Sequence, residues 1–218
     1  MYFEDREQAG QMLANDLCQL YSKDECIVVA MNDEAVLVGK PIAERLNCPL
    51  VMLMMDNIAV PGEDVDFGGM AGSGDFTYNS DLTQGEIDDY ASEYHSYFDE
   101  QKREVFQKLN EMMKQDSVLD SKMFHGRVVI LVAESLKTGT SLNIAVNFLK
   151  PIHIKRIVAA SPVSTVQASD KAHLLCDDVH ILDIKPNYMG AKHYYSQNNI
   201  PPHEQLVAMV SENLKKWI

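Results

Sequence analysis

The stretch VVILVAESLKTGTSLNIAV, from Val128 to Val146, reads as a strand, a loop and a helix in succession. Val128–Val132 is a short, unbroken apolar run, which is typical of a strand buried on both faces of a sheet. The loop holds one acid, Glu134, and the small polar cluster Thr138–Ser141. Because apolar residues then recur at helical spacing, the stretch predicts a strand that delivers its loop to the start of a helix.

The same alternation of apolar runs and helical patterns extends along the chain. Four more buried strands are predicted at Cys26–Met31, Pro49–Met55, Ile154–Ala160 and Asp178–Leu182. Helices are predicted at Asp5–Leu20, Glu34–Leu46, Ser141–Leu149 and Thr165–Leu174, and from Pro201 to Trp217. Strands that alternate with helices indicate an α/β fold with a mainly parallel sheet covered on both faces.

The middle of the chain departs from this pattern. Residues 56–80 are acidic, glycine-rich and irregular, and they include GGMAGSG over Gly68–Gly74, which lacks the GxGxxG spacing and favours a mobile loop. Two short strands are predicted near Val65–Met70 and Phe76–Tyr78, and a long polar helix over Thr83–Gln115 with Thr83 and Glu86 as a capping box. We expect residues 56–117 to form a hood-like excursion within a single domain of residues 1–218.

Composition limits the classes of function. The 218 residues are 46% hydrophobic, enough for one sizeable core, and carry a formal net charge of −13. We expect no nucleic-acid or anionic membrane partner, because both are recognised by clustered Lys and Arg. The N-terminus lacks a basic segment followed by an apolar one, and no apolar run approaches about 20 residues. We therefore predict a cytoplasmic protein without a signal peptide or a membrane span.

The metal-ligating and nucleophilic residue types form no recognisable site. The four cysteines are widely spaced without a CxxC pair, so we interpret them as reduced structural thiols, with a cysteine nucleophile as the alternative. The histidines are scattered without paired metal spacing. A group of acids matches no calcium loop, so a solvated loop is favoured over a cation site; its members are Glu63, Asp64, Asp66 and Asp75. We assign no metal ligand.

The loop after Val132 lies where ligands bind in open α/β sheets, at the carboxyl ends of the strands. Unpaired N–H groups at the start of the next helix favour an anion. The candidate phosphate-binding residues are Lys137, Thr138, Gly139, Thr140 and Ser141, and Glu134 could accept hydrogen bonds from sugar hydroxyls. The alternatives are an ordinary Ser/Thr helix cap and an exposed loop lysine.

This motif resembles the phosphoribosyl-diphosphate motif of type I phosphoribosyltransferases, in which two acids precede x-x-x-Thr-Gly-x-Thr. The segments FEDREQAGQMLANDL, HGRVVILV, IVAASPV and YMGAKHYYSQ are similar to one bacterial branch of predicted phosphoribosyltransferases. The resemblance implies the phosphoribosyltransferase fold and a 5-phosphate held by Thr138–Ser141. It also implies that Glu134 is the second acid, near the ribose hydroxyls and the reacting centre, and it makes this residue the catalytic candidate.

Three positions depart from the family pattern. Ala133 replaces the first acid of the motif. Asn32–Ala35 stands where the branch has Pro-Arg-Gly-Gly, a basic loop for the diphosphate, and Asp56–Asn57 stands in place of a basic pair. Two acids facing a diphosphate repel it unless Mg²⁺ bridges them, so Mg²⁺ is the one cofactor that we consider. We therefore expect a small phosphorylated ligand and weak or absent transferase activity.

Two further expectations concern the tail and the partners. Tyr194 and Tyr195 are candidates for stacking on a base, although burial of one ring and exposure of the other is equally expected. A homodimer is left open. The alternative function is a non-catalytic regulatory or interaction protein, whose acidic surface meets a basic partner through Asp81, Glu86, Asp88 and Asp89.

Overall fold

The computed structural model describes residues 1–72, 74–115 and 121–217 and divides the chain into two compact units. Unit 1 comprises Met1–Leu53, Leu119–Gly139 and Ile152–Ile218, and unit 2 comprises Met54–Val118 and Thr140–Pro151. Each unit has its own sheet. The expectation of one domain over residues 1–218 stays a prediction.

Unit 1 is built on a parallel sheet of five strands in the order β2-β1-β6-β7-β8. The strands are β1 (Cys26–Ala30), β2 (Leu50–Met52), β6 (Val128–Val132), β7 (Arg156–Thr165) and β8 (Asp178–Lys185). The helices are α1 (Arg6–Tyr21), α2 (Asp33–Leu46), η1 (Ser121–Phe124), α6 (Val166–Leu175), η2 (Ala191–Tyr194) and α7 (His203–Leu214). Every residue of β1 and β6 is buried, as their unbroken apolar sequences predict.

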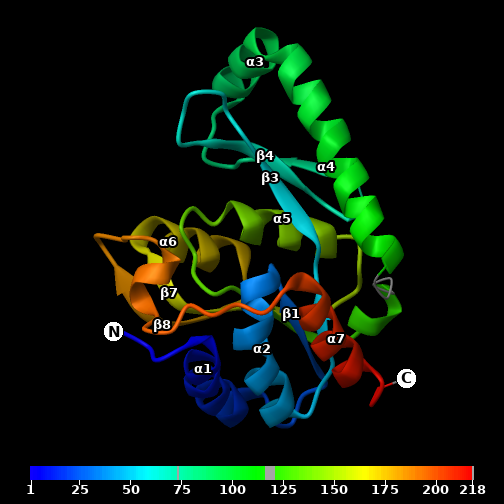
Figure 1. The fold of residues 1–218 in the computed structure, drawn as a ribbon, viewed down its shortest axis with the longest axis vertical. Helices are drawn as coiled ribbons and strands as arrows, with labels where there is room; N and C mark the ends of the chain where they lie inside the picture. The colour runs from blue at the N-terminus through cyan, green and yellow to red at the C-terminus, as the bar shows by residue number, and fades with distance from the viewer. Residues whose placement is uncertain (73, 116–120, 218) are drawn as a thin grey trace. The chain divides into compact units, whose positions relative to one another are not determined.

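Helices cover both faces of this sheet: Figure 1 shows α1 and α2 on one side of β7 and β8, and α6 on the other. Two glycines allow close packing, Gly10 between α1 and α2 and Gly39 between α2 and the strands β1 and β2. A Cβ on Gly10 would lie 2.3 Å from the carbonyl oxygen of Val38, and one on Gly39 would lie 3.2 Å from Leu50 and Val28. The predicted α/β fold with a parallel, doubly covered sheet is confirmed.

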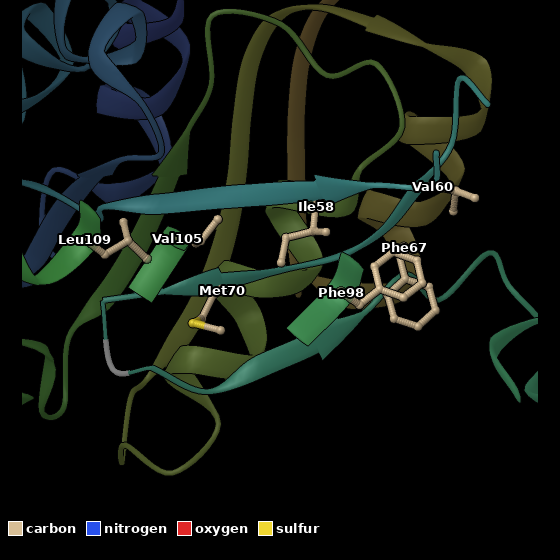
Figure 2. Close-up of a cluster of buried hydrophobic side chains, with 7 residues drawn as sticks. All are labelled: Ile58, Val60, Phe67, Met70, Phe98, Val105 and Leu109. Carbon is tan, nitrogen blue, oxygen red and sulfur yellow. The ribbon is translucent and has the colours of Figure 1, made fainter. Parts of the chain in front are cut away.

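Unit 2 contains an antiparallel sheet of three strands, β3 (Met55–Ala59), β4 (Asp66–Ala71) and β5 (Phe76–Tyr78). Its helices are α3 (Gln84–Glu93), α4 (His95–Gln115) and α5 (Thr140–Leu149). Side chains from β3, β4 and α4 meet in an apolar core (Figure 2), in which the rings of Phe67 and Phe98 stack at 3.9 Å between centroids. Helix α5 packs on the same sheet, and Gly69 makes room for it, since a Cβ there would lie 2.4 Å from Ile144.

Several predicted boundaries were wrong. The apolar run Pro49–Met55 is split, because β2 ends at Met52 in the sheet of unit 1 and β3 begins at Met55 in the sheet of unit 2. The expected mobile loop over Gly68–Gly74 begins inside β4, where glycine allows close backbone contact; residue 73 lies outside the described residues. The long polar helix is interrupted at Tyr94, although its Thr83–Glu86 capping box is confirmed.

Candidate functional site

The connectivity of the unit 1 sheet places two loops at its most favourable position for a ligand. From β1 the chain passes through α2 to β2 on one side, whereas β6 lies on the other side of β1. The connections therefore diverge between β1 and β6, and ligands of open parallel sheets bind at such a switch point, outside the carboxyl ends of the strands. The segments that leave the sheet there are Asn32–Glu34 after β1 and Ala133–Gly139 after β6.

Backbone hydrogen bonds hold the loop after β6 against the end of β7. The N–H of Leu136 donates to the carbonyl of Val163 at 2.9 Å, and the N–H of Thr165 donates to the carbonyl of Leu136 at 3.0 Å. The Thr165 hydroxyl also donates to the carbonyl of Lys137 at 2.8 Å. These contacts exist because β7 continues to Thr165, five residues beyond the predicted end at Ala160. The loop is therefore an ordered extension of the sheet edge.

Gly139 and Lys171 define the turn at the centre of the candidate phosphate loop. Gly139 has a φ of +75°, a backbone conformation that favours glycine. A Cβ at this position would lie 2.8 Å from Cδ of Lys171, whose buried side chain reaches the carbonyl of Thr138 at 3.4 Å. The turn thus requires glycine both for its backbone angle and for the space that Lys171 fills.

The five predicted phosphate-loop residues differ in exposure. Lys137 is exposed and Thr138 is partly buried. Gly139 is the last residue of the segment that belongs to unit 1. Thr140 and Ser141 are the first two residues of α5, with Thr140 buried and Ser141 partly buried. The chain therefore runs directly from the turn into the first helical turn, where backbone N–H groups lack partners within the helix. Phosphate binding by these residues stays a prediction.

Glu134, the remaining acid of the motif, is paired with a buried arginine from the start of α1. Nε of Arg6 donates a hydrogen bond to Oε2 of Glu134 at 2.6 Å, and Nη2 lies 2.6 Å from the same oxygen without hydrogen-bond geometry. Burial raises the pKa of Glu134 above its ordinary value, whereas the Arg6 charge opposes this rise. The Arg6 charge thus offsets part of the effect of burial on the pKa of Glu134.

The two tail tyrosines are both buried, each 3% exposed, rather than one buried and one exposed. The Tyr195 hydroxyl donates to the carbonyl of Glu134 at 2.6 Å, and Arg6 lies 4.5 Å above its ring. Tyr194 accepts a hydrogen bond from the N–H of Met189 at 3.1 Å and packs against Tyr188. Stacking of either ring on a base stays a prediction that these contacts do not favour, because protein groups already cover the rings.

The acidic positions that depart from the family pattern have partners within their own units. Asn32 caps α2 by accepting from the N–H of Ala35 at 2.8 Å, and Asp33 contacts Nδ1 of His203 at 2.8 Å. In unit 2, Asp56 pairs with Lys108 at 2.5 Å. Asp33 and Asp56 are therefore each paired with a group of their own unit.

Sequence reasoning missed three residues that contact the loop, Arg6, Thr165 and Lys171, and it did not place His203 beside Asp33. Arg6 and His203 lie 128 and 170 residues from their acidic partners. A buried arginine needs an anionic partner, but the sequence does not show that Arg6 is buried. Nothing in their local sequence separates them from surface residues.

The cysteine and metal alternatives find no support in the described residues. Burial raises the pKa of Cys26 to about 11 and the pKa values of Cys48 and Cys176 to about 12, which disfavours a nucleophilic thiolate. Over residues 1–72, 74–115 and 121–217, no group of three or more His, Cys, Asp or Glu side chains could hold a metal ion. Within the same ranges, no helix combines the length and apolarity needed to cross a membrane.

Comparison with known proteins relates this chain to named transferases. It is 26% identical over 163 residues to "Putative phosphoribosyl transferase MT0597" of Mycobacterium tuberculosis strain CDC 1551 / Oshkosh, and equally to "Putative phosphoribosyl transferase Rv0571c" of strain ATCC 25618 / H37Rv. The match covers 74% of this chain but only 35% of each relative, so the chain spans about a third of their length. No protein-family model matches the sequence.

Comparison of structures gives a match over nearly the whole chain. The crystal structure of TT1426 from Thermus thermophilus aligns with a TM-score of 0.74 and 21% identity, over 98% of this chain and 99% of that one. At this identity the likeness shows the fold. The chain thus shares the fold of TT1426, and 163 of its residues are similar in sequence to two proteins named as phosphoribosyl transferases.

Proposed function

We propose that this chain binds a phosphorylated sugar or nucleotide, either phosphoribosyl diphosphate or a nucleoside monophosphate, with the 5-phosphate at Lys137–Ser141. The observation that carries the proposal is the ordered turn at Gly139, which leads into the first turn of α5 from the switch point of the sheet. Backbone N–H groups and the positive end of a helix dipole favour a phosphate. The similarity to named phosphoribosyl transferases supports the same ligand class.

We further propose that transferase activity is weak or lost. Phosphoribosyl transfer expels diphosphate, so the active site must stabilise negative charge on the leaving group. Asp33 and Glu34, in the first turn of α2, add negative charge where the family resemblance implies a basic loop. At an effective dielectric constant of about 20, two unit charges about 4 Å apart interact by about 4 kcal/mol. Repulsion of that order opposes a diphosphate at this position.

At such a site Mg²⁺ would be bound together with the phosphates of the ligand rather than by protein ligands alone. Mg²⁺ keeps several waters and binds through one or two carboxylates together with substrate phosphates. Asp33 already contacts His203, and the described residues contain no ready cluster of three ligands. Mg²⁺ is therefore a condition of the binding test.

Calorimetry of the whole chain with phosphoribosyl diphosphate and with nucleoside monophosphates, with and without Mg²⁺, tests the binding proposal. Gly139→Asp should abolish binding, because the new carboxylate strains the turn and repels phosphate. Gly126→Asp is the matched control, since Gly126 has a similar φ of +71° in unit 1 and open space around it. Absence of binding by every ligand, or equal binding by the two variants, would contradict the proposal.

Turnover is tested separately by measuring diphosphate release from phosphoribosyl diphosphate with a panel of nucleobases. We expect release at the rate of a control without protein. Rapid release that requires both Mg²⁺ and a nucleobase would show that the site retains transferase activity.

A second candidate function rests on helix α3, none of whose residues is buried. Its exposed acids include Glu86, Asp88 and Asp89. We propose as the alternative that this surface binds a basic partner while the fold serves as a scaffold. Neutralising these acids together with Asp81 should then abolish co-purification of that partner, whereas retained co-purification would exclude the alternative.

A further inference from the structure

Arg6 is a buried charged residue, and its ionic partner lies in the loop after β6. Its side chain is 2% exposed, although it lies in the first turn of α1. A guanidinium is costly to bury without a partner, and Arg6 finds one in Glu134, with two nitrogens at 2.6 Å from Oε2. Its Nη1 also lies 3.4 Å from Oδ1 of Asn198, and its plane covers the Tyr195 ring. The arginine is therefore held on three sides.

The pairing leaves the two oxygens of Glu134 unequal. Both Arg6 contacts reach Oε2, and Oε1 has no hydrogen bond to any residue in the described part of the chain. The Glu134 side chain is 14% exposed, so it is not fully enclosed by protein. The Tyr195 hydroxyl fixes the main chain of the same residue through its carbonyl. The loop acid is thus clamped through one carboxylate oxygen and its own backbone.

The charged groups around Glu134 shift its pKa in both directions. Burial raises the pKa of Glu134, and the nearby Glu34 on α2 raises it further. Arg6 on α1 and Lys192 on η2 act in the opposite direction. Two phenols also face the residue, those of Tyr188 and Tyr195, and their own pKa values are raised by burial. Removal of Arg6 would leave mainly groups that favour the protonated acid.

We propose that Arg6 is a positioning residue, which holds Oε2 of Glu134 so that Oε1 can accept a hydrogen bond from a ligand hydroxyl, and that the site therefore prefers ribose 5-phosphate to 2-deoxyribose 5-phosphate. This inference rests on the proposed function, since it needs the phosphate at Lys137–Ser141. With the first acid of the motif replaced by Ala133, the single carboxylate of Glu134 carries the contact to the hydroxyls. A charge-assisted hydrogen bond to one hydroxyl gives a preference of about tenfold.

Calorimetry with ribose 5-phosphate, 2-deoxyribose 5-phosphate and inorganic phosphate, from about pH 5 to about pH 8, tests the inference. The wild type should prefer the ribose compound and lose this preference as Glu134 becomes protonated at low pH. Arg6→Met should lose it at a higher pH than the wild type, because the pKa of Glu134 rises without the guanidinium. Arg6→Lys keeps the charge and should restore the wild-type midpoint. Glu134→Gln should show no preference at any pH.

Each result has one reading. A shifted midpoint in Arg6→Met with rescue by Arg6→Lys supports the positioning role, which a purely structural arginine would not produce. The inference is overturned if Arg6→Met loses the ribose preference at the same pH as the wild type, or if the wild type binds the two sugar phosphates equally well. In either case, binding of a sugar phosphate still supports the proposed function. If neither sugar phosphate nor inorganic phosphate binds, both fail. If Arg6→Met does not fold, Arg6→Lys and Glu134→Gln decide: a ribose preference kept by Glu134→Gln overturns the inference.

Discussion

Nδ1 of His203 lies 2.8 Å from Oδ1 and 3.0 Å from Oδ2 of Asp33, which joins the start of α7 to the start of α2. The two residues are 170 positions apart in sequence. Asp33 stands where the phosphoribosyltransferases that the sequence resembles carry a basic loop for diphosphate. The contact therefore joins α7 to the segment after β1 in which the sequence departs from that resemblance.

Removing the charge of Asp33 should strengthen binding of phosphoribosyl diphosphate. We expect Asp33→Asn to raise this affinity about fivefold, because one repulsive charge near the diphosphate is lost. The affinity for ribose 5-phosphate should change less, and calorimetry measures both. Glu44→Gln is the matched control, since Glu44 is exposed in the last turn of the same helix. Equal effects of the two substitutions would mean that only net charge matters.

Substituting Gly139 should cost more stability than substituting Gly126. Both glycines have positive φ, so Gly139→Ala and Gly126→Ala should each lose about 1–2 kcal/mol of unfolding free energy. Gly139→Ala should lose about 1 kcal/mol more, because its Cβ meets the buried Lys171 side chain, whereas Gly126 has nothing within 4 Å. Chemical denaturation provides the comparison, and equal losses would contradict the crowding at Lys171.

The hydroxyl of Tyr195 should contribute measurably to stability. Tyr195→Phe removes the buried hydrogen bond to the Glu134 carbonyl, so we expect a loss of about 1–3 kcal/mol in unfolding free energy. Tyr2→Phe is the control, since the Tyr2 hydroxyl contacts His193 at an exposed site and should contribute below about 0.5 kcal/mol. A Tyr195→Phe variant as stable as Tyr2→Phe would show that the loop does not depend on this bond.

Stability should fall at alkaline pH because of the buried thiols. Burial raises the pKa of Cys26 to about 11 and that of Cys48 to about 12, compared with about 8.5 in an unfolded chain. Above about pH 8.5 the unfolded chain releases thiol protons that the folded chain retains, so the unfolding free energy decreases as pH rises. Denaturation between about pH 7 and about pH 10 should show this slope, and Cys48→Ala should reduce it. An unchanged slope would assign the effect to other groups.

The sequence by itself determined the local elements and the fold class. Apolar runs placed β1 and β6, and helix-cap chemistry placed the start of α3 at Thr83. The Thr138–Ser141 cluster placed the candidate loop between a strand and a helix. These features depend on neighbours within a few residues, because helix caps, turns and hydrophobic periodicity are local interactions.

Only the tertiary structure decided which distant groups meet. The sequence of Pro49–Met55 does not show where the chain leaves the sheet of unit 1 and enters the sheet of unit 2, because both sheets bury apolar residues. The pairs Arg6–Glu134 and Asp33–His203 arise from contacts across strands and helices far apart in sequence. A local pattern shows that a charge is present but not which partner compensates it. The loop could therefore be located from sequence, whereas the environment of its acid required the packed structure.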